Sequence, residues 1–150
     1  MLRTRFHKKI INLLYFCHMN QQLTKITPTS IAEGCYKEKG SKFLAYAMPI
    51  SSKEEVKEIV NRYKKEHHKA KHVCFAYRIG NDIRANDNGE PSGTAGRPIL
   101  RQIDAANLDN ALVVVVRYFG GTLLGTGGLI NAYKTASQDA IQNGLTSWNK

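Results

Sequence analysis

The sequence predicts one α+β domain in which a β-sheet packs against helices. Segments with the two-residue period of strands lie at 31–50 and 72–79, and four consecutive valines, 113–116, are typical of a strand covered on both faces. Apolar residues recur at helical spacing after Ser52 and after Gly128. The 150 residues, 42% hydrophobic and 23% charged, are enough to bury one core without disulfides or structural metal ions.

A β-hairpin and a helix are expected first. Two extended segments within 31–50 are separated by Lys39-Gly40, which indicates the hairpin turn. Either Ser51 or Ser52 can serve as the N-cap of the helix, with a glutamate three residues later to complete a capping box. The apolar stripe of this helix consists of Val56, Ile59, Val60 and Tyr63. Its opposite face carries Lys53, Lys57, Arg62 and Lys64. We interpret these cations as a solvated face, with a binding surface as the alternative.

A third strand and a second helix follow. Residues His72–Ile79 alternate as a half-buried strand does. Gly, Asn and Asp are frequent between 80 and 96, so this stretch is expected to be a turn and an exposed loop. A helix at about 98–106 should follow the loop.

The last strand and helix are expected at the end of the domain. Residues Ala111–Phe119 predict the central strand, because their β-branched run is uninterrupted. After a glycine-rich segment at 120–128, apolar residues recur at helical spacing from Leu129 to Ile141. Gly144 is the natural C-cap of that helix.

The chain is strongly basic. Lys and Arg number 22 against 12 Asp and Glu, a formal net charge of +10, which favours phosphate-bearing partners and salt-sensitive binding. A basic surface that serves only solubility is the alternative. Four of the positive charges lie before residue 10, in the N-terminal extension.

The cysteines and the N-terminal residues indicate in which cellular compartment the protein is expected. Cys17, Cys35 and Cys74 are odd in number and show no C-x-x-C spacing, which predicts a reducing, cytoplasmic location. The apolar run at 10–17 is short and has no small-residue cleavage site, and no run reaches the roughly 20 apolar residues of a membrane span. Translation that starts at Met19 is a further hypothesis, under which residues 1–18 are not native.

The most informative segment is Asp87 to Pro98. Its glycines free the backbone, Ser92 and Thr94 supply hydroxyls, and Arg97 supplies a fork of donors beside a helix N-terminus. Together these features predict a phosphate site. The alternative is a tight turn in which Ser92 or Thr94 only caps the helix. No lysine follows in the arrangement that a P-loop requires.

A second glycine-rich segment runs from Arg117 to Leu129. A dinucleotide site is disfavoured, because the last glycine of G-x-G-x-x-G is missing and no acid lies about 20 residues further on. The segment remains suited to backbone contacts with nucleic acid, or to packing against the first glycine segment.

The two segments supply the candidate residues for binding a ligand, phosphate or RNA. They are Glu90, Ser92, Gly93, Thr94, Gly96, Arg97, Arg117, Tyr118, Phe119, Gly120, Gly121, Gly125, Gly127 and Gly128.

No catalytic residue, metal ligand or cofactor is predicted. His67, His68 and His72 lie where a helix gives way to a strand, so we interpret them as surface histidines, and Cys74 as a core thiol. Asp87 and Glu90 are more typical of ion pairs that brace a loop than of an acid and base.

Four stretches carry a family resemblance. GEPSGTAGRPIL at 89–100 and RYFGGTLLGTGGLINAY at 117–133 resemble the paired signature of the IMPACT (YigZ-type) family. SKFLA at 41–45 and HVCFAY at 72–77 extend the match to about residues 30–141.

The resemblance implies a two-layer α+β fold similar to the second domain of ribosomal protein S5, and a role in translation. Eukaryotic relatives bind the activator of a starvation-responsive initiation-factor kinase and thereby restrain that kinase, whereas for bacterial relatives nucleic acid or the ribosome is the usual inference. Bacterial relatives usually continue into a ferredoxin-like domain. The expected division is therefore an extension at 1–29, the family domain at 30–143 and a tail at 144–150, without that second domain.

Three functional hypotheses follow. In the first, the protein is a translation-associated module that binds RNA or the ribosome through the two glycine segments, with Arg97 and Arg117 neutralising phosphates and Tyr118 or Phe119 stacking on bases. In the second, it is an adaptor whose basic helix at 52–66 docks on an acidic protein. In the third and least favoured, it is a nucleotide or phosphoester enzyme that uses Asp87, Glu90 and the 92–94 loop.

Overall fold

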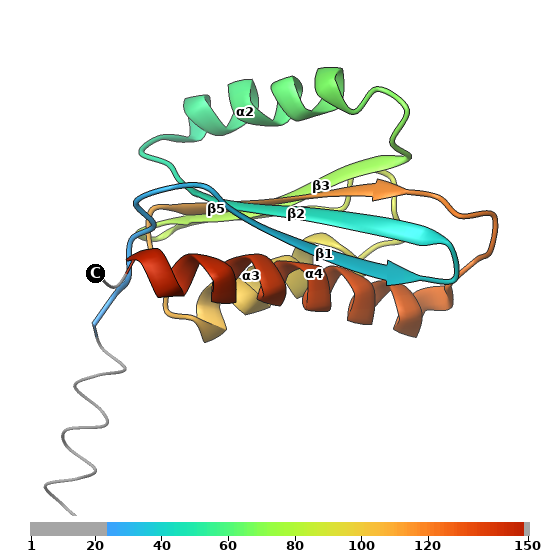
Figure 1. Cartoon of the computed structure of the whole chain (residues 1–150). Helices are drawn as coiled ribbons and strands as arrows, with labels where there is room; N and C mark the ends of the chain where they lie inside the picture. The colour runs from blue at the N-terminus through green and yellow to red at the C-terminus, as the bar shows by residue number, and fades with distance from the viewer. Residues whose placement is uncertain (1–23, 149–150) are drawn as a thin grey trace, which may run out of the picture.

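The computed structural model describes residues 24–148, which form one five-stranded sheet with helices on both faces (Figure 1). The strands are β1 (Ala32–Glu38), β2 (Ser41–Pro49), β3 (His72–Ile79), β4 (Asp82–Asn86) and β5 (Ala111–Tyr118). Their order across the sheet is β1-β2-β5-β3-β4, and every neighbouring pair is antiparallel. The strand with the four valines therefore lies at the centre of the sheet, as predicted.

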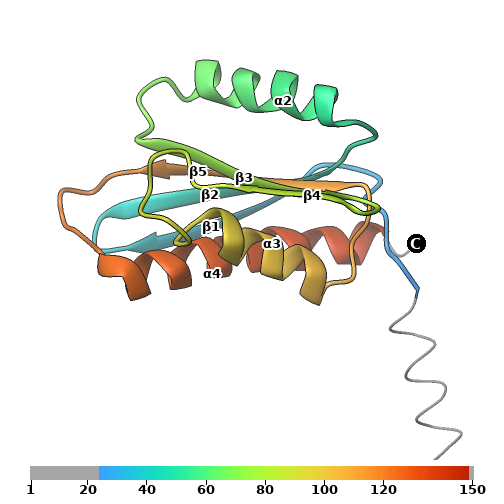
Figure 2. The ribbon, with the colours of Figure 1, turned by 180° about the vertical axis from the view of Figure 1, so that it is seen from behind.

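The helices are distributed unequally over the sheet. Helix α2 (Lys53–Glu66) covers one face, and α3 (Gly96–Ala105) and α4 (Gly125–Trp148) lie side by side on the other (Figures 1 and 2). The α+β class and the packing of helices on a sheet are confirmed. The layering differs from the two layers that the resemblance implied, because α2 adds a layer on the second face.

Strand β5 separates two apolar clusters. Val113 and Val115 belong to the cluster under α3 and α4, whereas Val114 and Val116 belong to the cluster under α2. All four side chains are fully buried. Successive side chains of a strand point to opposite faces, so an unbroken valine run is what a strand buried on both faces requires.

Local signals set the hairpin and the first helix. Lys39 and Gly40 both have positive φ, at 47° and 82°, as in a tight two-residue turn between β1 and β2. At α2, the Ser52 hydroxyl accepts from the Glu55 amide at 3.3 Å, and the Glu55 carboxylate accepts from the Ser51 amide at 2.9 Å. The hairpin and the N-cap are thus confirmed, with the capping contacts shared between both serines.

Strands β3 and β4 depart from the sequence expectation. Strand β3 is packed on both faces, since Cys74 and Ala76 enter one cluster while Val73 and Tyr77 enter the other. Strand β4 was expected to be loop, because Asp and Asn are depleted in strands. Pairing with β3 and an exposed place at the sheet edge make the strand possible there.

The observed boundaries of the last helix also differ from those predicted from the sequence. Helix α4 begins at Gly125, within the segment expected to be loop, and continues past Gly144 to Trp148. The prediction of Gly144 as a C-cap is wrong. A Cβ at this position would lie 2.2 Å from Cζ2 of Trp148, so glycine makes room for the indole ring. The indole Nε1 donates to the carbonyl of Ser30 at 3.1 Å.

The predictions for residues 1–18 and Met19 lie outside the described residues. Within residues 24–148, no helix combines the length and the apolar character that crossing a membrane requires.

Candidate functional site

The two glycine segments meet at one end of the sheet. Strands β4 and β5 both pair antiparallel with β3, so they run in the same direction and their following loops leave at the same end (Figure 2). A pocket of about 280 Å³ lies there. Its lining residues are Lys71, Glu90, Pro91, Arg117, Phe119, Leu123, Leu124, Gly125, Thr126 and Leu129. The pocket thus joins the loop after β4, the loop after β5 and the start of α4.

A buried ion cluster lies at this pocket, centred on the carboxylate of Glu90. Arg117 donates from one guanidinium nitrogen to both carboxylate oxygens, at 2.7 and 2.8 Å. The Tyr133 hydroxyl donates at 2.8 Å, and Nε2 of His72 lies 3.0 Å away. The side chains of Glu90 and Arg117 are only 3% and 5% exposed. Such a buried pair requires several partners to offset the loss of water.

His72 links this cluster to the first glycine loop. Its Nδ1 lies 2.7 Å from the carbonyl oxygen of Asn88, which can only accept, so Nδ1 carries a hydrogen. Its Nε2 lies 3.0 Å from a carboxylate oxygen of Glu90, so the ring bridges the first glycine loop and the ion cluster. The interpretation of His72 as a surface histidine is wrong, because its side chain is only 13% exposed and both ring nitrogens have polar contacts.

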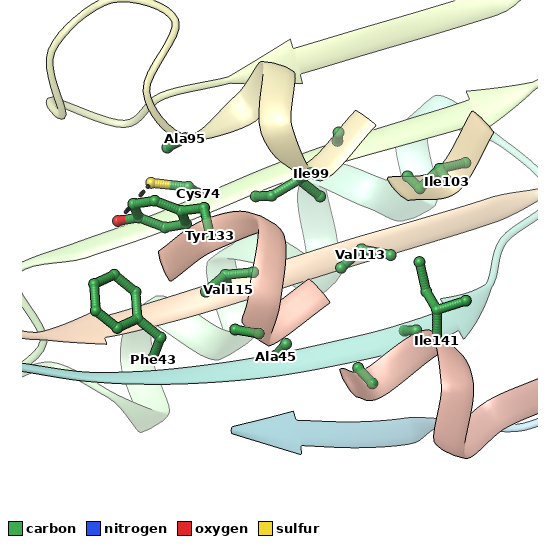
Figure 3. Close-up of a cluster of buried hydrophobic side chains, with 14 of the residues drawn as sticks. Phe43, Ala45, Cys74, Ala95, Ile99, Ile103, Val113, Val115, Tyr133 and Ile141 are labelled. Carbon is green, nitrogen blue, oxygen red and sulfur yellow. Dashed lines mark hydrogen bonds between the residues drawn. The ribbon is translucent and has the colours of Figure 1, made fainter. Parts of the chain in front are cut away.

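The core beneath the cluster contains a thiol and a phenol. The Cys74 thiol lies 3.4 Å from the Tyr133 hydroxyl (Figure 3). It also lies 3.1 Å from the carbonyl oxygen of Asp87. Burial raises the pKa of Cys74 to about 12, and burial also raises the pKa of Tyr133 well above its usual range. Both groups are therefore neutral at physiological pH and act as hydrogen-bond donors.

The raised pKa of Cys74 predicts low reactivity. With iodoacetamide at pH 8, we expect Cys35, which is exposed, to be alkylated much faster than Cys74, because the thiolate is the attacking species. Peptide mass spectrometry over a time course measures both sites, and unfolding in urea should make their rates similar. Equal rates in the folded protein would contradict the buried, protonated thiol.

The first glycine loop is closed by its own carboxylate. Asp87 accepts from the amides of Gly93 at 3.0 Å, Ala95 at 3.1 Å and Gly96 at 2.8 Å. Burial on its own raises the pKa of Asp87, but these three hydrogen bonds outweigh burial and hold the pKa below its usual value. The carboxylate thus occupies the amides that the sequence predicted would hold a phosphate.

The remaining candidates in this loop are divided between surface and core. Ser92 and Arg97 are exposed, and neither lines the pocket. Thr94 is 1% exposed, and its hydroxyl donates to the carbonyl of Pro91 at 2.6 Å. Asp87 and Glu90 brace the loop, in agreement with their interpretation as structural carboxylates.

The second segment places its residues on different faces of the sheet. Arg117 is not a free surface cation, because its charge is paired with Glu90. Tyr118 points toward α2, and its hydroxyl lies 2.6 Å from Nδ1 of His67. The amide of Gly120 donates to the Ser41 hydroxyl at 3.3 Å. Gly120 also packs closely on Gly40, because a Cβ at Gly120 would lie 2.0 Å from the carbonyl carbon of Gly40.

The start of α4 is open, in contrast to the start of α3. Gly125, Thr126 and Gly127 are exposed, and no side chain in the described part of the chain accepts from their amides. The helix runs for 24 residues, so its N-terminus carries the positive end of a full helix dipole. Gly128 is half-buried in the same turn, and Gly121 precedes it with a φ of 88°.

Positive charge and an aromatic ring flank this open helix start. Nζ of Lys71 lies 4.8 Å from the ring centroid of Phe119, which is 41% exposed. Arg117 lies 5.6 Å from the same ring, and within residues 24–148 its Nε has no hydrogen-bond partner although it is buried. The arrangement is suited to holding an anion beside an aromatic surface.

Sequence reasoning missed Lys71, His72 and Tyr133 as members of this site. His72 is placed by strand register, since it lies opposite Arg117 in the pairing of β3 with β5. Lys71 is fixed by the same pairing, because its amide donates to the Arg117 carbonyl at 2.8 Å. Register between distant strands leaves no local signal in the sequence.

Fold and site together define an α+β domain with a buried Glu–Arg–His–Tyr cluster beneath an open helix start. The protein-family model of the Impact N-terminal domain matches residues 39–141 of this sequence. The chain belongs to the IMPACT family, and the resemblance found in the sequence is confirmed.

Several relatives are similar over most of the chain. The IMPACT family member YvyE of Bacillus subtilis is 43% identical over 69% of this chain and 49% of its own length. The IMPACT family member YigZ of Escherichia coli is 35% identical over 88% of this chain and 65% of its own length. The chain thus spans about half to two thirds of the length of these relatives.

Solved structures agree with the fold. The crystal structure of a hypothetical protein superposes with a TM-score of 0.76 at 34% identity, covering 79% of this chain and 60% of that one. The two-domain translational regulator Yih1 has a TM-score of 0.50 at 24% identity, covering 84% of this chain and 52% of its own. The likeness to Yih1 concerns the fold alone.

Proposed function

We propose that this protein acts in the control of translation by binding phosphate groups of RNA, free or in the ribosome, at the pocket between the two glycine loops. The open amides at the start of α4 carry the proposal: Gly125 and Thr126 line the pocket with Lys71, and Gly127 follows them as an exposed residue. The link to translation is supported by a relative with this fold that is described as a translational regulator.

The parts of the pocket have different roles in this proposal. Lys71 and the helix dipole attract the phosphate, and the exposed face of Phe119 offers a stacking surface for a base. Arg117 acts indirectly, because Glu90 neutralises most of its charge and fixes its position. RNA binding should therefore depend more on Lys71 than on Arg117, which the sequence predicted to neutralise phosphates.

Replacing Lys71 by alanine should weaken binding to a short single-stranded RNA and lower the slope of log K against log salt by about 0.7, the value for one phosphate contact on a single strand. Fluorescence anisotropy across a salt series measures both quantities. Lys134→Ala is the matched control, since Lys134 is exposed on α4 and does not line the pocket. If the two variants behave alike, net charge and not the pocket governs binding.

A further inference from the structure

A second recess lies on the α2 face of the sheet. It has a volume of about 420 Å³, within the range of sites for small ligands and single nucleotides, and runs between α2 and strands β3 and β4. Its lining residues are Lys53, Val56, Lys57, Val60, Asn61, Lys64, Phe75, Tyr77 and Arg84. We call this recess the α2 groove. None of these residues lines the pocket between the glycine loops.

The charges along α2 are distributed unequally between its two flanks. Lys53, Lys57 and Lys64 follow one another at helical spacing along the α2 groove, and Arg84 faces them from β4. Within residues 24–148 no carboxylate lines the groove, although that of Asp82 accepts from the hydroxyl of the lining residue Tyr77 at 3.4 Å. A separate depression on its other flank is lined by Glu55, Glu58 and Glu66 together with Arg62, and Glu54 lines neither recess. The flank that lines the groove is therefore the more basic of the two, and this excess of positive charge favours an anionic occupant.

The floor of the α2 groove is apolar and aromatic. Val56, Val60 and Tyr77 are buried, while Phe75 is only half-buried between the cations. Single-stranded nucleic acids are bound where cations that follow the backbone flank an aromatic ring on which a base can stack. An acidic peptide could pair with the cations, but it has no planar base for the ring of Phe75.

We propose that the α2 groove binds a single-stranded segment of nucleic acid, with phosphates between the α2 lysines and Arg84 and a base on Phe75. The proposal does not rest on the function of the pocket, because the two sites share no residue. An RNA strand that contacts both sites would reach them from opposite faces of the sheet.

Anisotropy titration of the full chain with a short single-stranded RNA tests the groove. The double variant Lys57→Ala/Arg84→Ala should lower the salt slope by about 1.4, because two phosphate contacts are lost. The charge-matched control Lys37→Ala/Lys134→Ala removes two exposed lysines elsewhere and should keep the slope near that of the unmodified protein. Equal loss in both double variants would overturn the proposal.

Phe75→Leu tests the stacking contact without changing charge. We expect binding to weaken at least about fivefold, the lower end of the contribution of one base–aromatic stack, with an unchanged salt slope. Thermal melting checks that the variant is folded. Unchanged RNA affinity in Phe75→Leu, or an oligoglutamate peptide that binds as tightly as the RNA, would overturn the proposal in favour of an acidic protein partner.

The variants also separate the two sites. Loss of binding in Lys71→Ala with normal binding in Lys57→Ala/Arg84→Ala would refute the α2 groove and leave the pocket supported. The reverse result would refute the pocket and leave the groove supported.

Discussion

Replacing Glu90 by leucine should lower the free energy of unfolding by about 3–5 kcal/mol, because the charge of Arg117 would remain buried without a partner. Only 5% of the Arg117 side chain is exposed, and both of its hydrogen bonds run to Glu90. In the same variant Tyr133 would lose its hydrogen-bond acceptor and His72 its contact with the carboxylate. Urea unfolding followed by circular dichroism measures the loss.

The double variant Glu90→Leu/Arg117→Met is the control for this result. Replacing a buried ion pair by apolar residues of similar volume is often neutral or stabilising, so most of the lost stability should return. If the double variant is no more stable than Glu90→Leu alone, the loss comes from packing or from His72 and Tyr133. That result would contradict the explanation that Glu90→Leu is unstable because the charge of Arg117 is left unpaired.

Replacing Gly34 by alanine should cost about 1–3 kcal/mol or more, since it forces β1 and α4 apart. A Cβ at Gly34 would lie 2.3 Å from the backbone nitrogen of Ala140, which cannot move independently of its helix. Thermal and urea unfolding both report the loss.

Gly127→Ala is the matched control, with an effect of opposite sign. A Cβ at Gly127 meets no atom within 4 Å, and the residue lies in the first turn of α4. Alanine there should stabilise the protein by up to about 1 kcal/mol, because glycine loses more conformational freedom in a helix. Equal stability of Gly34→Ala and the unmodified protein would show that β1 and α4 are less tightly packed than described.

The sequence predicted those elements whose signals are local. The turn at Lys39-Gly40, the cap at Ser52 and the valine run of β5 each depend on residues within a few positions of one another. Strand β4 was missed because its polar residues are held by pairing with β3 and not by their own propensity. Gly144 was wrongly assigned as a C-cap, because the reason for glycine there is its close contact with the indole ring of Trp148, which exists only if the helix continues to that residue.

The sequence indicated the two segments that border the candidate site, but not the pairing of the side chains within them. Both glycine segments were identified, and their packing against each other was anticipated. The occupation of the first loop by Asp87 and the neutralisation of Arg117 by Glu90 were not, because any of several nearby carboxylates and cations could have filled those roles. Lys71 joins the site only through the register of β3 against β5.

Amide chemical shifts of the isotope-labelled full chain, followed during titration with a short single-stranded RNA, test the phosphate pocket most directly. We expect the largest changes at Gly125, Thr126, Gly127 and Lys71, where the amides and the cation are open to a ligand. The amides of 93–96 should change little, because Asp87 already occupies them. Changes concentrated at 93–96, or none at 125–127, would contradict binding of phosphate at the start of α4.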